Sequence, residues 1–155
     1  MRSPSPAVEV REAEARDLDA LLDLYEQLAD GQSGSMPADP GRAAALLTEI
    51  RSVSGRALLV AVVDERVVGT ADCMIVVNLT HAGKAFATVE NVVVDADTRR
   101  AGIGSALMAA VLERAELAGC YKVQLISRKG RPAAHDFYRS LQFEASAEGF
   151  RRYLE

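Results

Sequence analysis

The sequence predicts a mixed α+β fold. Three observations carry this prediction: β-branched apolar runs joined by short turns, amphipathic segments of helical period, and a strand that leads through a glycine turn into a helix at 89–105. Runs joined by short turns pair antiparallel, whereas a strand–helix–strand passage makes a parallel crossover. We therefore expect a twisted, mostly antiparallel central sheet flanked by four helices.

The first third of the chain predicts one strand and two helices. Residues 8–11 alternate as a short strand does, and residues 1–7 are rich in Pro and Ser, which predicts a flexible tail. Asp17 stands where it can cap a helix whose apolar residues fall at helical spacing. Asp39 and Pro40 supply a cap and a first-turn proline for the second helix.

The middle of the chain predicts a three-stranded meander. Residues 57–64 and 67–79 are apolar, β-branched runs joined by the tight turn Asp64-Glu65-Arg66, so they are expected to form an antiparallel hairpin. A third run at 85–94 ends just before the glycine turn.

The last third predicts a helix, a strand, a short helix and a closing hairpin. The helices are expected at 102–118 and 132–141, with the strand between them at 121–126. The apolar stretches 143–145 and 150–154 predict the closing hairpin.

Length and composition limit the class of protein. The chain has 155 residues, of which 49% are hydrophobic and 26% are charged, and this length and composition are typical of one soluble globular domain. No apolar run approaches the roughly 20 residues of a membrane span. A net charge of −4 disfavours a broad nucleic-acid surface. Cys73 and Cys120 have no metal-ligand or secretory pattern, so we expect a cytoplasmic protein without metal, nucleic-acid or membrane partners.

The glycine turn predicts a phosphate site. Backbone N–H groups in the first turn of a helix have no intrahelical acceptor and lie at the positive end of the helix dipole, so an anion completes their hydrogen bonding. Gly102 and Gly104 remove side chains that would keep the anion away, and Arg99 and Arg100 add positive charge. The alternative is an ordinary strand-to-helix turn with two solvated arginines.

The spacing excludes two common phosphate sites. A dinucleotide fold needs a third glycine where Leu107 stands, and a nucleoside triphosphate loop needs a lysine that is absent from Gly104-Ser105-Ala106.

The turn Arg99-Arg100-Ala101-Gly102-Ile103-Gly104 resembles the R/Q-x-x-G-x-G/A coenzyme A pyrophosphate loop of the GNAT superfamily of N-acetyltransferases. Three further strings match that superfamily in the same order: ENVVV at 90–94, GCYKVQL at 119–125, and AHDFY followed by LQF at 134–143. The similarity covers residues 8–154 and implies a single N-acetyltransferase domain over 8–155. Gln142 departs from the family's usual glycine, so either it adopts a left-handed backbone or the turn differs.

The resemblance implies acetyl-CoA as the cosubstrate. It implies a sheet splayed between the strand before the glycine loop and the strand after the third helix, with the pantetheine arm in the gap. It places pantetheine against the main chain of Val92, Val93 and Val94. It places the pyrophosphate among Arg99, Arg100, Ala101, Gly102, Ile103, Gly104 and Ser105. A homodimer is left open.

Acetyl transfer to an amine needs a base, because an alkylamine with a pKa of about 10.4 is mostly charged at neutral pH. Glu90 interrupts an apolar strand, and burial would raise its pKa into the useful range; the alternative is a solvent-facing residue. A main-chain N–H near Val93 or Val94 is a candidate for stabilising the oxyanion. The resemblance makes the Tyr138 hydroxyl the proton donor to the thiolate; the alternative is a core aromatic.

Three functions remain open from the sequence. The leading one is an acetyl-CoA-dependent N-acetyltransferase acting on a small-molecule amine by direct attack in a ternary complex. The alternatives are a non-catalytic acetyl-CoA sensor or regulatory module, and a peptide or protein N-acetyltransferase. The acceptor pocket is expected at residues 30–39, the first two helices and the turn at 80–84, none of which carries a diagnostic motif.

Overall fold

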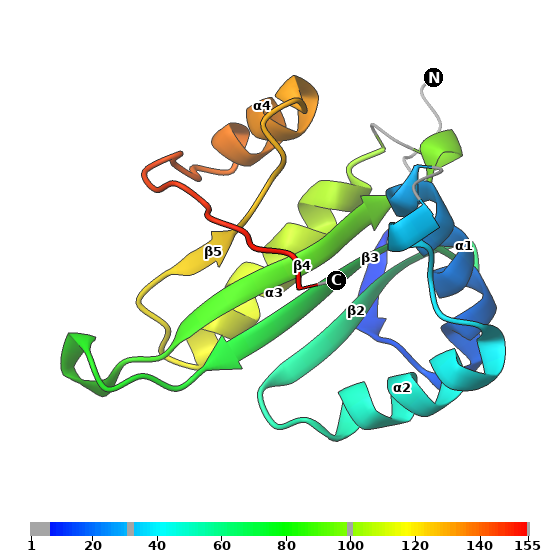
Figure 1. The fold of residues 1–155 in the computed structure, drawn as a ribbon, viewed down its shortest axis with the longest axis horizontal. Coiled ribbons are helices and arrows are strands. Elements are labelled where there is room, and N and C mark those ends of the chain that lie inside the picture. The colour runs from blue at the N-terminus through cyan, green and yellow to red at the C-terminus, as the bar shows by residue number, and fades with distance from the viewer. Residues whose placement is uncertain (1–6, 31–32, 99–100, 155) are drawn as a thin grey trace. The chain divides into compact units, whose positions relative to one another are not determined.

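A computed structural model describes residues 7–30, 33–98 and 101–154 of the chain (Figure 1). The chain divides into two compact units, residues 1–124 and 125–155. No helix in the described ranges is long and apolar enough to cross a membrane. The single domain expected over 8–155 stays a prediction.

The first unit is built on the sheet, and the second contains the last helix. The strands are β1 (Glu9–Glu12), β2 (Arg56–Val63), β3 (Arg66–Val76), β4 (Phe86–Val94) and β5 (Val123–Leu125), the last of which crosses the boundary between the units. The α-helices are α1 (Leu18–Ala29), α2 (Pro40–Ser52), α3 (Ile103–Leu117) and, in the second unit, α4 (Pro132–Ser140).

The strand order is β1-β2-β3-β4-β5, and β1 to β4 pair antiparallel (Figure 1). Next to β4, the Tyr121 N–H donates to the Ala85 carbonyl at 2.9 Å, and the Ala87 N–H donates to the Lys122 carbonyl at 3.0 Å. The mostly antiparallel α+β fold is therefore confirmed. The expected splay between β4 and β5 concerns residues beyond Gln124 and stays a prediction.

The β2–β3 turn forms as the sequence predicts. Asp64 and Glu65 both have positive φ, 46° and 62°, and together they connect the two strands. A two-residue turn with φ above zero at both positions matches the right-handed twist of the flanking strands, and Asp is among the residues that tolerate it. The turn therefore sets the register of the two adjoining pairs, Val63 with Arg66 and Val62 with Val67, and beyond them the register shifts between Ala61 and Val62.

The start of α1 differs from the prediction. Asp17 does not cap α1 with its side chain; its carboxylate accepts hydrogen bonds from Arg11 Nη1 and Nη2 at 2.7 and 2.9 Å and from the Glu14 N–H at 2.8 Å. The Arg11 guanidinium holds the pKa of Asp17 below its usual value. At α2 the predicted cap is confirmed, because Asp39 accepts a hydrogen bond from the Arg42 N–H at 3.2 Å.

The sheet carries helices on both faces. Helices α1 and α2 cover the face that we call the α1/α2 face, and α3 covers the opposite face (Figure 1). The core on the α1/α2 face contains Ala13, Leu21, Leu47, Leu58 and Val60. On the other face α3 lies very close to β3, because a Cβ at Gly69 would stand 3.0 Å from Ile103 Cγ2 and 3.1 Å from Leu107 Cδ1. Gly69 therefore allows the helix that follows the glycine turn to pack against the sheet.

In the second unit, Gln142 has the left-handed backbone that the sequence left open, with a φ of 66°. The Phe143 N–H donates to the Tyr138 carbonyl at 3.0 Å, which closes the last turn of α4. The predicted closing hairpin is wrong, because residues 143–154 contain no strand. Phe150 and Leu154 are each 90% exposed, and a two-stranded hairpin without a buried face is marginal in water.

Gln142→Gly is expected to stabilise the protein by about 1 kcal/mol, because a non-glycine residue in the left-handed region costs roughly 1–2 kcal/mol and glycine also gains entropy in the unfolded chain. Urea unfolding of the two proteins measures the difference. Gln124→Gly, at a position of β5 without positive φ, is the control and should destabilise. Equal or lower stability of Gln142→Gly would contradict the strain.

Candidate functional site

The glycine turn opens α3 in the predicted way. Gly102 precedes the helix with a φ of 77°, and the first intrahelical bond runs from the Ala106 N–H to the Gly102 carbonyl at 3.0 Å. The N–H groups of residues 103–105 therefore have no acceptor within the helix. Among the described residues other than Gly102 and its two chain neighbours, no atom lies within 4 Å of the place where a Cβ would stand at Gly102.

The other predicted phosphate contacts have different environments. Ala101 and Ser105 are exposed, Gly104 is half-buried, and Ile103 is buried against the sheet. Arg99 and Arg100 lie outside the described residues. The N–H groups of residues 103–105, which have no acceptor within the helix, and the left-handed Gly102 fit an anion bound through backbone N–H groups.

A β-bulge in β4 follows Glu90, and the sequence analysis missed it. The register with β3 shifts here; the partners on either side are Thr70 with Val93 and Asp72 with Glu90. Asn91 and Val92 therefore lie opposite Ala71 alone, and Asn91 has a φ of 51°. An asparagine inside a β-branched run was the available signal, because Asn tolerates the left-handed region.

The bulge begins the segment of three residues, Val92 to Val94, that is expected to contact pantetheine. Val93 is buried, and Val92 and Val94 are half-buried. Directly after them the Asp95 N–H donates to the Val68 carbonyl at 2.8 Å, which keeps the end of β4 attached to β3. Val92 thus belongs to the bulge, and Val93 and Val94 lie between the bulge and the glycine turn.

Glu90 is exposed, so the burial expected at this position is not found. It is paired with Asp72 across the strands, and paired residues of antiparallel strands project to the same face. Asp72 projects to the α1/α2 face together with its cross-strand partner Leu58, which belongs to the core there. Glu90 therefore lies on the α1/α2 face, directly beside a second carboxylate.

A buried polar cluster surrounds that second carboxylate. Arg56 Nε and Nη2 donate to the two oxygens of Asp72 at 3.0 and 2.6 Å, and the Thr70 hydroxyl donates to the Leu59 carbonyl at 2.7 Å. Tyr25 of α1 contacts Thr70, and burial raises the pKa of its phenol to about 12. The hydrogen bonds that Arg56 donates to Asp72 raise the pKa of Arg56. The signal for this cluster was a charged residue, Asp72, within an apolar run.

Tyr138 belongs to an aromatic cluster in the second unit. Its ring lies 5.2 Å from the Phe137 ring and 5.9 Å from the Phe143 ring, measured between centroids. Burial raises the pKa of the Tyr138 phenol. Nearby in the same unit, His135 Nε2 is hydrogen-bonded to the Arg128 carbonyl at 2.8 Å. A half-buried tyrosine that stays protonated at neutral pH has the chemistry of a proton donor.

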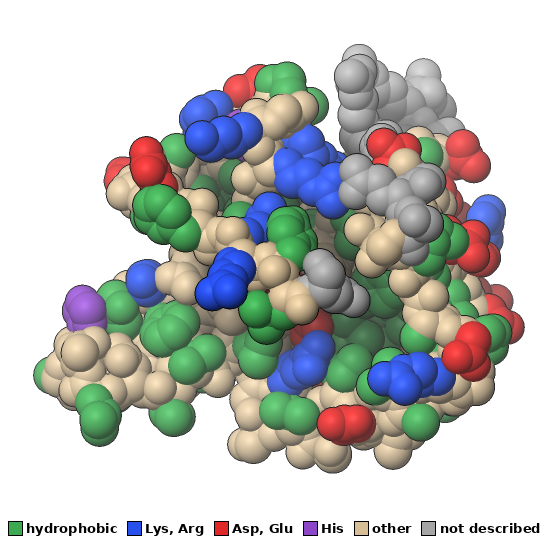
Figure 2. Space-filling model, in the orientation of Figure 1, with side chains coloured by type: hydrophobic (Ala, Val, Ile, Leu, Met, Phe, Trp, Pro, Cys, Tyr) green, Lys and Arg blue, Asp and Glu red, His purple; other side chains and the backbone are tan. Residues whose placement is uncertain are grey.

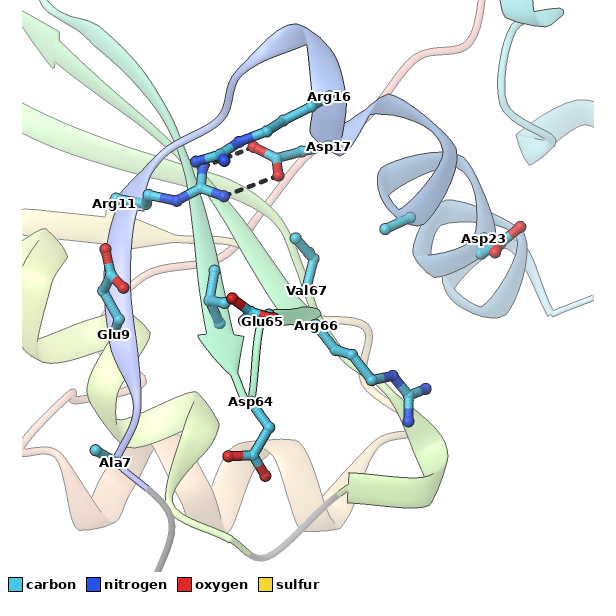
Figure 3. Close-up of a pocket in the computed structure, with 12 residues that line it drawn as sticks. Ala7, Glu9, Arg11, Arg16, Asp17, Asp23, Asp64, Glu65, Arg66 and Val67 are labelled. Carbon is cyan, nitrogen blue, oxygen red and sulfur yellow. Dashed lines mark hydrogen bonds and ion pairs between the residues drawn. The ribbon is translucent and has the colours of Figure 1, made fainter.

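A surface pocket of about 830 Å³ lies between β1, the β2–β3 turn and the start of α1 (Figure 3). Figure 3 shows the Arg11–Asp17 ion pair at one side and the turn residues Asp64, Glu65 and Arg66 projecting around the opening. None of the predicted site residues that the structure describes lines it. Within the described residues, no group of three or more His, Cys, Asp or Glu could hold a metal ion.

Acidic side chains gather over α1, along the right-hand side of Figure 2. Asp19, Asp23 and Glu26 of that helix are all exposed. The solvent side of α1 therefore presents negative charge, which attracts cations rather than anions.

Known proteins resemble this chain in sequence and in fold. A model of the acetyltransferase (GNAT) family matches residues 19–143. The glucosamine 6-phosphate N-acetyltransferase of Trypanosoma brucei brucei is 34% identical over 146 residues, which cover 89% of this chain and 90% of that protein.

Two solved structures are similar over nearly their whole length. A putative acetyltransferase from Agrobacterium tumefaciens str. C58 superposes with a TM-score of 0.86 at 33% identity, covering 94% of this chain and 99% of that one. A chain described as a transcriptional regulator from Bacillus halodurans C-125 has a TM-score of 0.84 at 32% identity, covering 96% of this chain and 100% of that one.

Proposed function

The chain belongs to the acetyltransferase (GNAT) family, and from this premise we propose that it transfers the acetyl group of acetyl-CoA to the primary amine of a phosphorylated amino sugar. The observation that carries the acceptor class is the 34% identity to a glucosamine 6-phosphate N-acetyltransferase over nearly both chains. A cytoplasmic location and a homodimer remain predictions.

In the proposed reaction the amine nitrogen attacks the thioester carbonyl, a C–N bond forms and the C–S bond breaks. The N–H groups at the start of α3, together with Arg99 and Arg100, bind the pyrophosphate of acetyl-CoA. The main chain of Val92 to Val94 holds the pantetheine arm, and an N–H near Val93 or Val94 stabilises the oxyanion.

Glu90 takes the proton of the amine, directly or through water, and its exposure supports contact with solvent and a soluble acceptor. Tyr138 donates its proton to the departing thiolate. The raised pKa of Tyr138 supports this role, because the hydroxyl stays protonated throughout the neutral range.

Release of the CoA thiol over a panel of amines tests the proposal. We expect the highest kcat/KM with glucosamine 6-phosphate, a lower value with glucosamine, and little turnover with peptide amines. Tight acetyl-CoA binding without turnover on any amine would instead favour the sensor module, and a preference for peptides would favour a protein N-acetyltransferase.

Glu90→Gln is expected to lower kcat/KM by about 10-fold at pH 7, with a deficit that shrinks as the pH rises. The base matters most when the amine must still lose a proton, and an exposed site lets water replace part of its function. A pH–rate profile identical to that of the parent protein would contradict the role of base, and Glu90 would then be a solvent-facing residue without catalytic function. Glu65→Gln, in the β2–β3 turn, is the matched control for the charge change.

A further inference from the structure

A glutamine side chain attaches the end of β4 to α1. Gln27, in the last turn of α1, accepts a hydrogen bond from the Ala96 N–H through Oε1 at 2.9 Å and donates one from Nε2 to Asp95 Oδ1 at 3.3 Å. The partners fix the orientation of the amide, because an N–H group can only donate and a carboxylate can only accept. Figure 1 shows the end of α1 beside the end of β4, and this two-point contact joins them.

Asp95 also organises the chain that follows β4. Its carbonyl accepts hydrogen bonds from the Thr98 N–H at 3.0 Å and the Thr98 hydroxyl at 3.2 Å, and its Oδ1 accepts a second bond from the Asp97 N–H at 3.3 Å. An Asp side chain that bonds the backbone two residues further on stabilises a turn. Its own N–H is bound to the Val68 carbonyl of β3. Asp95 is therefore the point at which β3, α1 and the residues after β4 are held together.

The segment that Asp95 organises leads into the glycine turn. Only residues 99–101 separate Thr98 from Gly102, and a link this short transmits a displacement of the segment before it. On the other side of Gly102, Ile103 is buried where α3 packs against β3. Helices α1 and α3 lie on opposite faces of the sheet, so the chain between β4 and α3 is attached to α1 at its start and to the α3 packing at its end.

We propose that Gln27 and Asp95 are positioning residues for acetyl-CoA. Their contact fixes the direction from which the chain enters Gly102, and it thereby orients the N–H groups at the start of α3 toward the pyrophosphate. The inference rests on the proposed binding of acetyl-CoA at this turn, and it extends that proposal by assigning the contact on which the placement of the turn depends. A turn that is already placed in the free protein loses less entropy when the cosubstrate binds, so the contact contributes to affinity without touching the ligand.

Calorimetric titration with acetyl-CoA tests the proposal in Gln27→Met, Asp95→Ala and the double variant. Methionine keeps the length and helix propensity of glutamine and removes both hydrogen bonds. The Kd should rise by about 3- to 10-fold in each single variant, the range that one or two net hydrogen bonds cover. The double variant should lose little more than the weaker-binding single variant, because the two residues act through one contact. With one amine throughout, KM for acetyl-CoA should rise by the same factor while kcat stays within about 2-fold.

Two further variants separate geometry from charge. Asp97→Ala removes an exposed carboxylate from the same turn and keeps the backbone N–H, so binding of an anion should be unchanged or slightly tighter. Asp95→Ala also removes a negative charge but should bind more weakly, which is the opposite sign. Asp95→Asn keeps an Oδ1 acceptor for both of its hydrogen bonds and should bind acetyl-CoA at least as tightly as the parent protein.

Backbone NMR of the free protein follows the turn without ligand or turnover. In Gln27→Met the Ala96 N–H should exchange faster with solvent, and the amide signals of residues 102–105 should shift although they lie far from position 27 in the sequence. Should Asp95→Ala fail to fold, Gln27→Met decides the question, because it leaves the bonds from Asp95 to Asp97 and Thr98 in place.

An unchanged Kd in Gln27→Met would overturn the inference, and Gly102→Val, measured in parallel, shows whether the proposed function falls with it. Weaker binding in Gly102→Val alone would leave the glycine turn as the cosubstrate site without the Gln27 contact. Unchanged binding in both variants would contradict the cosubstrate site as well.

Discussion

Gly102→Val is expected to weaken acetyl-CoA binding by on the order of 10- to 100-fold, the equivalent of one or two charge-assisted hydrogen bonds. Gly102 has a φ of 77°, a conformation that a β-branched residue strongly disfavours, so valine would rotate the turn and misdirect the N–H groups that follow it. Gly104→Val places a branched side chain in the same first turn and should act in the same direction. Calorimetric titration with acetyl-CoA measures the change.

Gly119→Val provides the matched control for backbone strain. Gly119 lies at the opposite end of α3 and also has a positive φ, of 70°, so valine there should cost similar stability. Its affinity for acetyl-CoA should nevertheless stay close to that of the parent protein. Unchanged affinity for acetyl-CoA in a folded Gly102→Val protein would show that the glycine turn does not bind the cosubstrate.

Much of the fold follows from short-range rules. The Asp64-Glu65 turn and the Asp39 cap each depend on residues close in sequence, and each was predicted. The Asp17 carboxylate was misassigned because its partner, Arg11, lies on a strand rather than in the helix that Asp17 was expected to cap. The predicted closing hairpin does not form, because two short apolar stretches do not by themselves provide a surface against which to bury them.

The candidate site was less predictable, because its geometry depends on strand register. The bulge at Asn91 and Val92 decides which side chains of β4 share a face with Asp72, and a one-residue shift reverses that face. Residue spacing within β4 therefore identified Glu90 but not its exposure or its neighbours. The Arg56–Asp72 pair joins residues 16 positions apart, and only the pairing of β2 with β3 brings them together.

The Tyr138 hydroxyl can be removed without removing the ring and its aromatic contacts. Its ring contacts Phe137 and Phe143, and phenylalanine at this position would keep both contacts. The stability change in Tyr138→Phe should therefore be about 1 kcal/mol or less, the net value of one hydrogen bond. A loss of turnover in a Tyr138→Phe protein that is still folded would therefore be due to the missing hydroxyl proton.

Tyr138→Phe is expected to lower kcat on the order of 10²-fold while acetyl-CoA affinity changes little, because a general acid acts on the leaving thiolate rather than on the bound thioester. Burial raises the pKa of Tyr138, so the parent hydroxyl is fully protonated below that pKa and the deficit should be nearly constant from pH 6 to about 9. Tyr153→Phe makes the same chemical change at a side chain that is 79% exposed and should leave turnover unaltered. Turnover and melting temperature measured together distinguish the two possibilities: full activity in Tyr138→Phe would make this residue a packing aromatic, and the thiolate would then take its proton from water.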